Sequence, residues 1–226
     1  MEHNSKKSYL SWLMGLVGIN IIVFVHELGH FLAAHLFSVP TPTFSIGFGP
    51  ALIKLPLGDT IFQLSLLPLG GYVEINQEIL AQQPYLYKMI VILAGIIFNI
   101  IFSVIIASYY RQSAAQESSP AQTCLEYIRA NSKKSGIIGP IGLIHMIGQS
   151  FLINKHIFWV MLSIISLNIA LFNLLPLPFF DGGQALLFTL SALGTVIPSN
   201  FITLISFLIF FVFILLLSIK DVIKLK

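Results

Sequence analysis

Residues 17–37 read VGINIIVFVHELGHFLAAHLF, and the five residues from His26 to His30 decide how the chain is interpreted. On an α-helix, residues four apart lie within about 40° of each other around the axis, so His26 and His30 project from one face. Zinc binds neutral imidazole nitrogens, and hydrolysis needs a carboxylate that takes a proton from water without ligating the metal. The motif HExxH supplies both within one helical turn, so it predicts His26 and His30 as zinc ligands and Glu27 as the catalytic base.

The apolar surroundings of this motif argue against a chance match. Between Tyr9 and Phe37, Glu27 is the sole charged side chain. An ionisable group inside an apolar helix of membrane length is costly and usually functional. The same motif on a soluble helix would often be an ordinary surface feature. We therefore interpret it here as half of a catalytic metal site.

The composition is that of a membrane protein. Hydrophobic residues make up 56% of the 226-residue chain, charged residues 9%, and the mean hydropathy is +0.90. Soluble domains carry about 25% charged residues. Each membrane crossing takes about 20 residues, so we expect residues 1–226 to form a single membrane-embedded domain. The net charge of +3 comes mainly from lysines near expected helix ends, where they anchor a protein to lipid headgroups. We expect no nucleic-acid partner.

The predicted fold class is an α-helical multi-pass membrane protein with about four transmembrane helices. Long apolar runs place these helices at about 9–37, 85–110, 156–175 and 200–219. A polar loop, 111–135, and an interfacial segment, 136–153, lie between the second and third helices. A short helical stretch is expected between Gly183 and Leu193.

A membrane-associated β-hairpin or small sheet is predicted between the first two helices, over about 43–76. Repeated prolines and glycines exclude a long straight helix, although the segment stays apolar. Apolar and polar residues alternate in Phe62-Gln-Leu-Ser-Leu66, the period of a strand, and Leu57-Gly58-Asp59 predicts a turn before it. Because bare β edges are not tolerated in lipid, we expect this sheet to pack against protein or to line a watery cleft.

A third zinc ligand is predicted at Asp181, a carboxylate stranded among apolar residues. It follows the third expected helix in Asn173-Leu-Leu-Pro-Leu-Pro-Phe-Phe-Asp181-Gly-Gly. The prolines end that helix, and Gly182 and Gly183 allow the backbone turns that would aim the carboxylate. The first and third helices cross the membrane in the same direction, so the end of the third reaches the depth of the histidines. The two motifs are therefore expected to meet.

Together these motifs resemble the site-2 protease family of intramembrane zinc metalloproteases. The resemblance also rests on Phe44-Ser-Ile-Gly-Phe-Gly-Pro50 and Pro68-Leu-Gly-Gly-Tyr-Val73, and it covers nearly the whole chain in order. It is closest to the bacterial regulator-of-sigma-factor branch, which cleaves membrane-anchored anti-sigma factors and signal-peptide remnants. Members of that branch usually carry PDZ domains between the second and third helices. The segment 111–135 has no room for one.

The resemblance implies one catalytic zinc ion held by His26, His30 and Asp181, with Glu27 as general base. It also implies that Asn173 binds the substrate backbone or the developing oxyanion. The implied substrates are single-pass membrane proteins, cut in or near their transmembrane segments after a first cut by another protease. The family's β region is thought to receive the substrate as an added strand. The implied location is the bacterial inner membrane, with the site opening towards the cytosol.

Two positions depart from the family pattern without removing a proposed ligand. Family members often have Ala-Gly-Pro in the second helix, where this chain has Ala94-Gly95-Ile96. They often have a histidine after the double glycine, where this chain has Gln184. Gly95 and Asn99, in the second helix, are interpreted as residues for helix packing and interhelical hydrogen bonding.

Two other functions fit part of the sequence. A zinc-binding membrane transporter would place the same residues along an ion path, although a transporter usually carries polar stripes through several helices. The expected helix at 200–219 has none. An inactive relative would bind membrane segments without cutting them, and the intact ligand set with Glu27 argues against that.

Two arguments disagree about membrane orientation. Ten lysines and arginines fall on the side of the N-terminus, and only Lys54 and Lys88 on the other. The positive-inside rule would therefore place the N-terminus in the cytoplasm. The family resemblance implies the opposite, with both termini outside and the site facing the cytosol. We adopt the family orientation because its motifs are more specific than a charge bias.

Overall fold

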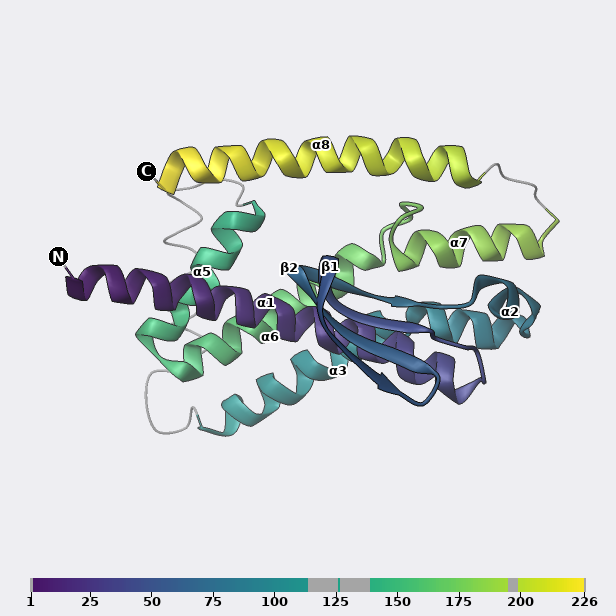
Figure 1. Ribbon diagram of the computed structural model, residues 1–226, viewed down its shortest axis with the longest axis horizontal. Helices are drawn as coiled ribbons and strands as arrows, with labels where there is room; N and C mark the ends of the chain where they lie inside the picture. The colour runs from purple at the N-terminus through teal and green to yellow at the C-terminus, as the bar shows by residue number, and fades with distance from the viewer. Residues whose placement is uncertain (1, 114–125, 127–138, 195–198, 226) are drawn as a thin grey trace. The chain divides into compact units, whose positions relative to one another are not determined.

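The computed structural model describes residues 2–113, 126, 139–194 and 199–225. Its elements are α1 (Glu2–Leu36), β1 (Thr43–Leu57), β2 (Thr60–Glu74), α2 (Gln77–Gln82), α3 (Tyr85–Ser113), α5 (Pro140–Ile153), α6 (Lys155–Asn173), α7 (Asp181–Ala192) and α8 (Ser199–Leu225) (Figure 1). Within these ranges, four helical segments are long and apolar enough to cross a membrane: Ser8–Leu36, Tyr85–Tyr110, Lys155–Asn173 and Leu204–Ile223. With the β-hairpin between the first two, they confirm the predicted fold class.

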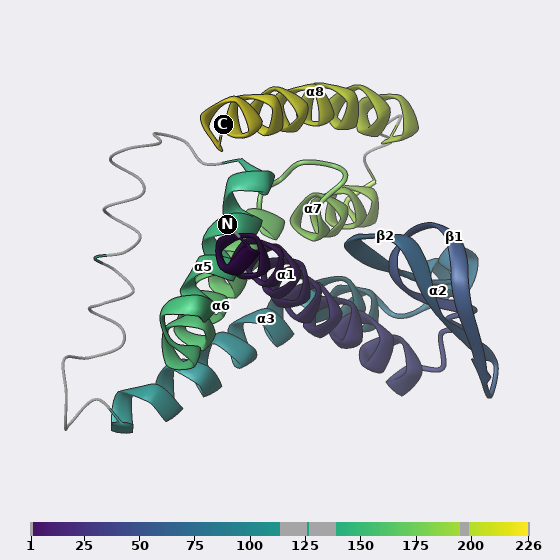
Figure 2. The same cartoon turned by 60° about the vertical axis from the view of Figure 1, so that its left-hand side comes forward.

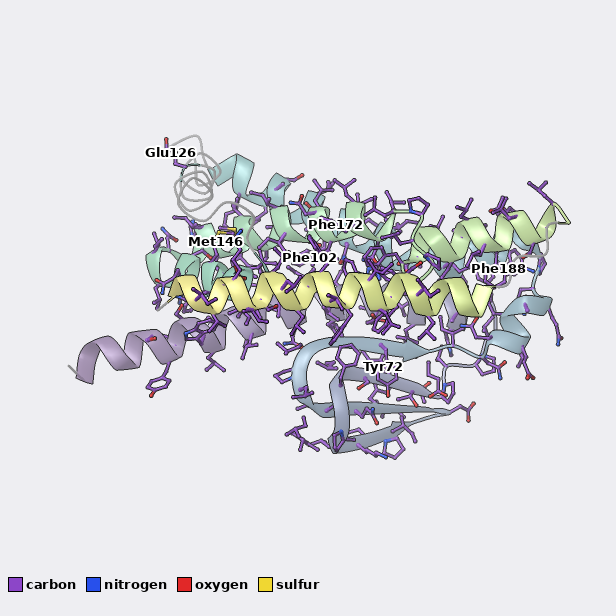
Figure 3. All side chains as sticks on the ribbon, turned by 90° about the horizontal axis from the view of Figure 1, so that it is seen from above. Tyr72, Phe102, Glu126, Met146, Phe172 and Phe188 are labelled. Atoms are coloured by element: carbon purple, nitrogen blue, oxygen red, sulfur yellow. The ribbon has the colours of Figure 1, made fainter. Side chains whose placement is uncertain are left out.

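The helices expose side chains that a soluble protein would bury. On α8, Ile209 is 67% and Leu216 is 60% exposed. The sticks along α8 in Figure 3 are almost all carbon. A continuous apolar surface of this kind is compatible with lipid and not with water. The chain is an integral membrane protein.

The chain divides into two compact units. One contains Met1–Ile19, Phe102–Ser166 and Leu208–Lys226, and the other contains Asn20–Ile101 and Leu167–Phe207. Every predicted site residue belongs to the second unit. Of the polar loop expected at 111–135, α3 takes up 111–113, and the remainder apart from Glu126 lies outside the described residues.

In the first unit, a side chain of α8 caps the N-terminus of α5. Asp221 is 6% exposed, and its two carboxylate oxygens accept hydrogen bonds from the backbone N–H groups of Gly139 (3.1 Å) and Gly142 (2.8 Å). Gly139, the N-cap residue of α5, has no side chain to do this. The first N–H groups of a helix lack intrahelical partners, so Asp221 satisfies them and complements the helix dipole.

In the second unit, β1 and β2 form a two-stranded antiparallel sheet. Leu57 pairs with Thr60 across the predicted turn, where Gly58 has a φ of 59°. Bulges bend both strands, so 43–46 pairs on one side with 61–64 and on the other with 71–74. Figure 2 shows the strands curling back on themselves.

This sheet buries polar side chains and exposes apolar ones. Ser45 and Ser65 are 0% and 2% exposed, with their hydroxyl oxygens 3.1 Å apart. Leu64 and Leu66 are 40% and 53% exposed. A hairpin on a soluble protein shows the reverse pattern. The inverted pattern suits a sheet whose outer face meets lipid and whose hydrogen-bonding groups are satisfied internally.

Aromatic contacts join the sheet to the second half of α1. The ring of Phe31 lies 5.7 Å from that of Phe44 and 5.4 Å from that of Phe62. Strand β2 is also fixed by Asn20, whose Nδ2 donates to the carbonyl of Pro68 at 2.7 Å. These contacts hold the sheet against the part of α1 that carries HELGH.

Replacing Asp221 with alanine should destabilise the first unit, because two N–H groups of α5 lose their acceptor. We expect Asp221→Ala to lower the free energy of unfolding by about 1–2 kcal/mol, the usual cost of removing a helix cap. Unfolding in detergent, followed by circular dichroism, measures this. The control is Val222→Ala, at an exposed neighbour. Equal stability of the two variants would show that the cap contributes nothing.

Candidate metal centre

The two histidines of HELGH lie on one face of α1 and are largely buried. Each is 8% exposed, and their Nε2 atoms are 3.2 Å apart. This closeness follows from the spacing of four residues, which returns the chain to the same side of the helix. The helix thus presents two ring nitrogens to one point.

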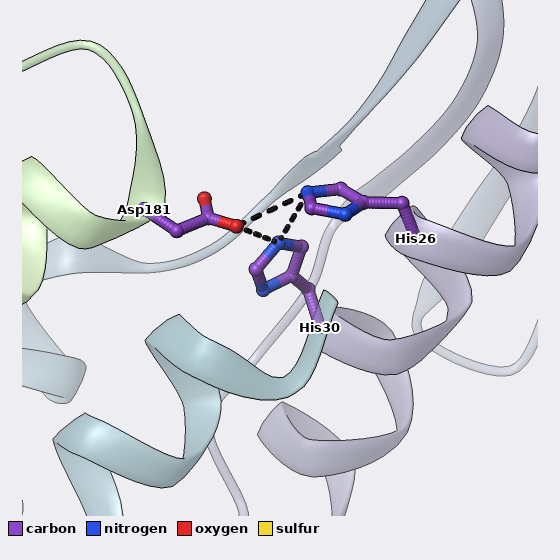
Figure 4. Close-up of side chains that lie close together, drawn as sticks. All are labelled: His26, His30 and Asp181. Carbon is purple, nitrogen blue, oxygen red and sulfur yellow. Dashed lines mark hydrogen bonds and ion pairs between the residues drawn. The ribbon is translucent and has the colours of Figure 1, made fainter. Parts of the chain in front are cut away.

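Asp181 brings a carboxylate to the same point. Its Oδ2 lies 3.1 Å from Nε2 of His26 and 3.3 Å from Nε2 of His30 (Figure 4). The two histidines of HExxH and Asp181 are about 150 residues apart in the sequence. The fold brings them together, as the sequence predicts.

A tight loop between α6 and α7 aims this carboxylate. Any side chain at Gly182 would meet the backbone of Leu174, and any side chain at Gly183 would meet that of Leu177. Gln184 braces the loop by donating from Nε2 to the carbonyl of Pro178 at 2.9 Å. Only glycines permit this close return of the chain.

The position of Asp181 at the start of α7 favours its charged form. It is the first helical residue, where the helix dipole stabilises a negative charge. Burial acts to raise the pKa of Asp181, but the neighbouring rings of His26 and His30 outweigh it and hold the pKa at about 2. The carboxylate is therefore ionised at neutral pH, as a metal ligand must be.

The three atoms fit a zinc ion. Zinc bonds of about 2.0 Å in tetrahedral geometry separate the ligand atoms by about 3.3 Å. The observed separations are 3.2, 3.1 and 3.3 Å. Two imidazoles and one carboxylate also form a common donor set for catalytic zinc, which leaves a fourth position open.

The hydrogen bonding of His30 supports this role. Its Nδ1 lies 2.9 Å from the backbone carbonyl of Val91 on α3. A carbonyl can only accept, so Nδ1 carries a hydrogen, and in the neutral ring Nε2 then presents its lone pair towards Asp181 and His26. A hydrogen on a ring nitrogen or a bound metal ion can bridge atoms that converge in this way.

Gly95 makes room for the cluster. An added Cβ there would lie 2.7 Å from Cε1 and from Nε2 of His26, and closer still to Nε2 of His30. The side of α3 that faces the histidines must therefore be bare at this position. The interpretation of Gly95 as a packing residue is incomplete, because the groups that pack against it are the rings of the two predicted zinc ligands.

Glu27 lies beside the cluster and is held by the sheet. Its Oε2 accepts a hydrogen bond from the backbone N–H of Val73 at 3.0 Å. Gly71 allows the strand to pack closely here, since an added Cβ would lie 2.7 Å from the carbonyl oxygen of Ser45 and 3.2 Å from Cγ1 of Val23. The carboxylate is thus fixed close to the ligands without being one of them.

A cavity of about 420 Å³ is lined by His26, Glu27, His30 and Asp181. Asn173, the last residue of α6, also lines it, and its Nδ2 donates to the carbonyl of Ile169 at 3.1 Å. Phe188, labelled in Figure 3, lies in the wall contributed by α7. The remaining lining residues are Tyr72, Val73, Ile75, Gln77, Leu80, Ile92, Phe179 and Gln184.

Three contributions to this centre escaped the sequence-based reading: the Val91 carbonyl, the Val73 N–H and the amide of Asn99, which lies 3.3 Å from Nδ1 of His26. The first two are backbone groups and leave no residue-type signal. Asn99 did leave one, because it is the single polar residue between Met89 and Phe102. Its hydrogen bond does join two helices, but the partner is a predicted zinc ligand.

Known proteins share these features. The chain matches the model of peptidase family M50 over residues 14–217. The membrane metalloprotease ARASP of Arabidopsis thaliana chloroplasts is 39% identical over 108 residues, covering 42% of this chain and 24% of its own. A “Putative zinc metalloprotease” of Borreliella burgdorferi is 36% identical over 112 residues, covering 42% and 26%. Another with this name, from Helicobacter pylori strain J99, is 32% identical over 142 residues, covering 56% and 40%.

The aligned part is less than half the length of each of these relatives. The family match, by contrast, extends over most of the present chain and includes HELGH, the sheet and Asp181. The chain belongs to peptidase family M50, the family of the site-2 proteases.

Proposed function

We propose that residues 1–226 form one membrane-embedded peptidase domain, a zinc metalloendopeptidase that cuts peptide bonds within or near the transmembrane segments of other proteins. The observation that carries the proposal is that Nε2 of His26, Nε2 of His30 and Oδ2 of Asp181 lie within 3.3 Å of one another. A second carboxylate, that of Glu27, lies beside these three atoms and is not one of them. The zinc-metalloprotease names of the relatives support it. We propose a single zinc ion.

The residues divide the work of peptide hydrolysis. A zinc ion supplies Lewis-acid chemistry, including a fall in the pKa of water to about 7. Glu27 accepts the proton of the attacking water and then delivers it to the leaving amine. The Val73 N–H keeps the Glu27 carboxylate oriented while it does so. Asn173, on the cavity wall, offers a neutral amide to the substrate backbone or the developing oxyanion.

The edge of the sheet supports a mode of substrate binding. The N–H of Val73 donates to Glu27 rather than to another strand, so the 71–74 edge faces the cavity. A peptide unwound in lipid needs partners for its backbone groups, and a strand edge supplies them. We propose that the substrate adds to this edge, which brings its peptide bond to Glu27.

The partners that we propose are those implied by the resemblance to the site-2 proteases. They are single-pass membrane proteins such as anti-sigma factors or signal-peptide remnants, shortened beforehand by another protease. We place the protein in a bacterial inner membrane. The metal centre then opens towards the cytosol.

Replacing Glu27 with glutamine should abolish cleavage while leaving zinc bound. The ligand set stays intact, but the side chain can no longer take a proton. We expect cleavage of a single-pass membrane peptide in detergent to fall by about 10²- to 10⁴-fold. Zinc content is measured on the same samples, and Glu78→Gln, an exposed acid on α2, serves as control. Cleavage at the wild-type rate by Glu27→Gln would rule out this base, and zinc flux into liposomes without any proteolysis would favour a transporter.

Replacing Gly95 with alanine should displace the zinc ligands. The added methyl would occupy the space of the two imidazole rings, so we expect zinc occupancy and cleavage to fall together. Without a steric conflict, glycine to alanine in a helix would stabilise the protein. The control is Ile97→Ala, on the exposed side of α3. Full zinc occupancy in Gly95→Ala would contradict the placement of the metal against α3.

Fusing reporters to the C-terminus should decide the orientation. With the site towards the cytosol, both chain ends lie outside. A fused reporter that works only outside the cytoplasm is therefore expected to be active, and a cytoplasmic reporter inactive. The reverse pattern would support the charge bias over the family orientation.

A further inference from the structure

One stripe of α3 contacts both histidines. Val91, Gly95 and Asn99 are spaced by four residues and so share a helix face. The carbonyl of Val91 lies 2.9 Å from Nδ1 of His30, and the amide nitrogen of Asn99 lies 3.3 Å from Nδ1 of His26. Gly95, between them, contributes empty space. The stripe thus contacts Nδ1 of each ring, the outer nitrogen, while Nε2 of each ring, the inner nitrogen, faces Asp181.

Metal binding through Nε2 sets a condition on the outer nitrogen. A neutral imidazole that gives its Nε2 lone pair to zinc carries its hydrogen on Nδ1, and that hydrogen needs an acceptor. For His30 the backbone carbonyl of Val91 meets this condition. For His26 the group at hydrogen-bonding distance is the side chain of Asn99.

A carboxamide can meet the condition for either form of the ring. Its nitrogen donates and its oxygen accepts, and a half turn of the amide exchanges the two. With nitrogen towards Nδ1, the ring carries its hydrogen on Nε2, 3.1 Å from the Asp181 carboxylate. With oxygen towards Nδ1, the hydrogen moves to Nδ1 and the Nε2 lone pair is released for a metal.

The burial of Asn99 shows that the amide is placed for a partner rather than for solvent. Asn99 is 0% exposed, on a helix segment that is otherwise apolar from Met89 to Phe102. A buried amide is costly unless it is hydrogen-bonded. An aspartate would accept from Nδ1 more strongly, but it would bring a second buried charge next to Asp181.

We propose that Asn99 is a positioning residue of the metal centre: its side-chain oxygen accepts the hydrogen of His26 Nδ1 and so selects the ring form whose Nε2 binds zinc. This inference rests on the zinc site proposed above. It predicts that the residue at 99 controls zinc affinity without touching the metal or the substrate.

Zinc affinity in detergent, measured by competition with a chromophoric chelator, tests the proposal. Asn99→Leu keeps the number and branching of the side-chain heavy atoms but removes the acceptor, so we expect zinc to bind about 10- to 100-fold more weakly, as for other lost partners of metal-bound histidines. Asn99→Asp keeps an acceptor and should bind zinc at least as tightly as the wild type. Ser103→Ala, which removes another buried polar group of α3 whose hydroxyl lies 3.2 Å from that of Ser163, should bind normally.

The aspartate variant shows whether the side chain at position 99 accepts a hydrogen bond from His26 Nδ1 or donates one to it. Weaker binding in Asn99→Asp than in Asn99→Leu would mean that the amide donates to Nδ1, and unchanged binding in Asn99→Leu would mean that it only fills space. Either result overturns the proposal. Unfolding of the chelator-treated proteins shows whether each variant is folded, and Asn99→Ala replaces the leucine variant if that one is not.

Failure of the underlying zinc site gives a different result. If the wild type binds no zinc, or if His26→Ala binds as tightly as the wild type, then the proposed function is wrong as well. If the wild type binds zinc, His26→Ala does not, and Asn99→Leu behaves like the wild type, only the role of Asn99 is refuted.

Discussion

The structure depends on the convergence of three electron-rich atoms in an apolar environment. Nε2 of His26, Nε2 of His30 and Oδ2 of Asp181 lie 3.1–3.3 Å apart, a separation at which either a hydrogen on a ring nitrogen or a bound metal ion bridges them. Three features of the second unit hold these atoms in place. HELGH supplies two from one helical turn, the double glycine lets the loop deliver the third, and the start of α7 stabilises its charge.

A second constraint is the need of every backbone polar group for a partner where water is scarce. The sheet meets it by burying Ser45 and Ser65 and by turning leucines outwards. It also explains the link between sheet and chemistry. Within the described part of the chain, the edge that carries the Val73 N–H pairs with no further strand. This N–H donates to Glu27, so one hydrogen bond joins the proposed base to the proposed docking edge.

Much of this arrangement could be predicted from the sequence, because it depends on the spacing of residues that are close together along the chain. Four local features each predict a particular geometry, and the structure shows it: the interval of four between His26 and His30, the isolation of Asp181, the long apolar runs and the turn at Gly58. Helix ends were close to expectation: α6 ends at Asn173, ahead of the prolines.

The remainder could not be predicted because it depends on which faces meet in three dimensions. Sequence spacing shows that Val91, Gly95 and Asn99 share a face, but not that this face meets the histidines. The backbone groups of Val73 and Val91 carry no residue-type signal. The alternation in 62–66 predicts a strand, but it does not say that the polar side is the buried one.

X-ray absorption at the zinc edge on the purified chain tests the central claim most directly. The account predicts one zinc per chain, with a first shell of nitrogen and oxygen at about 2.0 Å and the outer scattering of two imidazole rings. Absence of tightly bound zinc, or a first shell without imidazole, would contradict it.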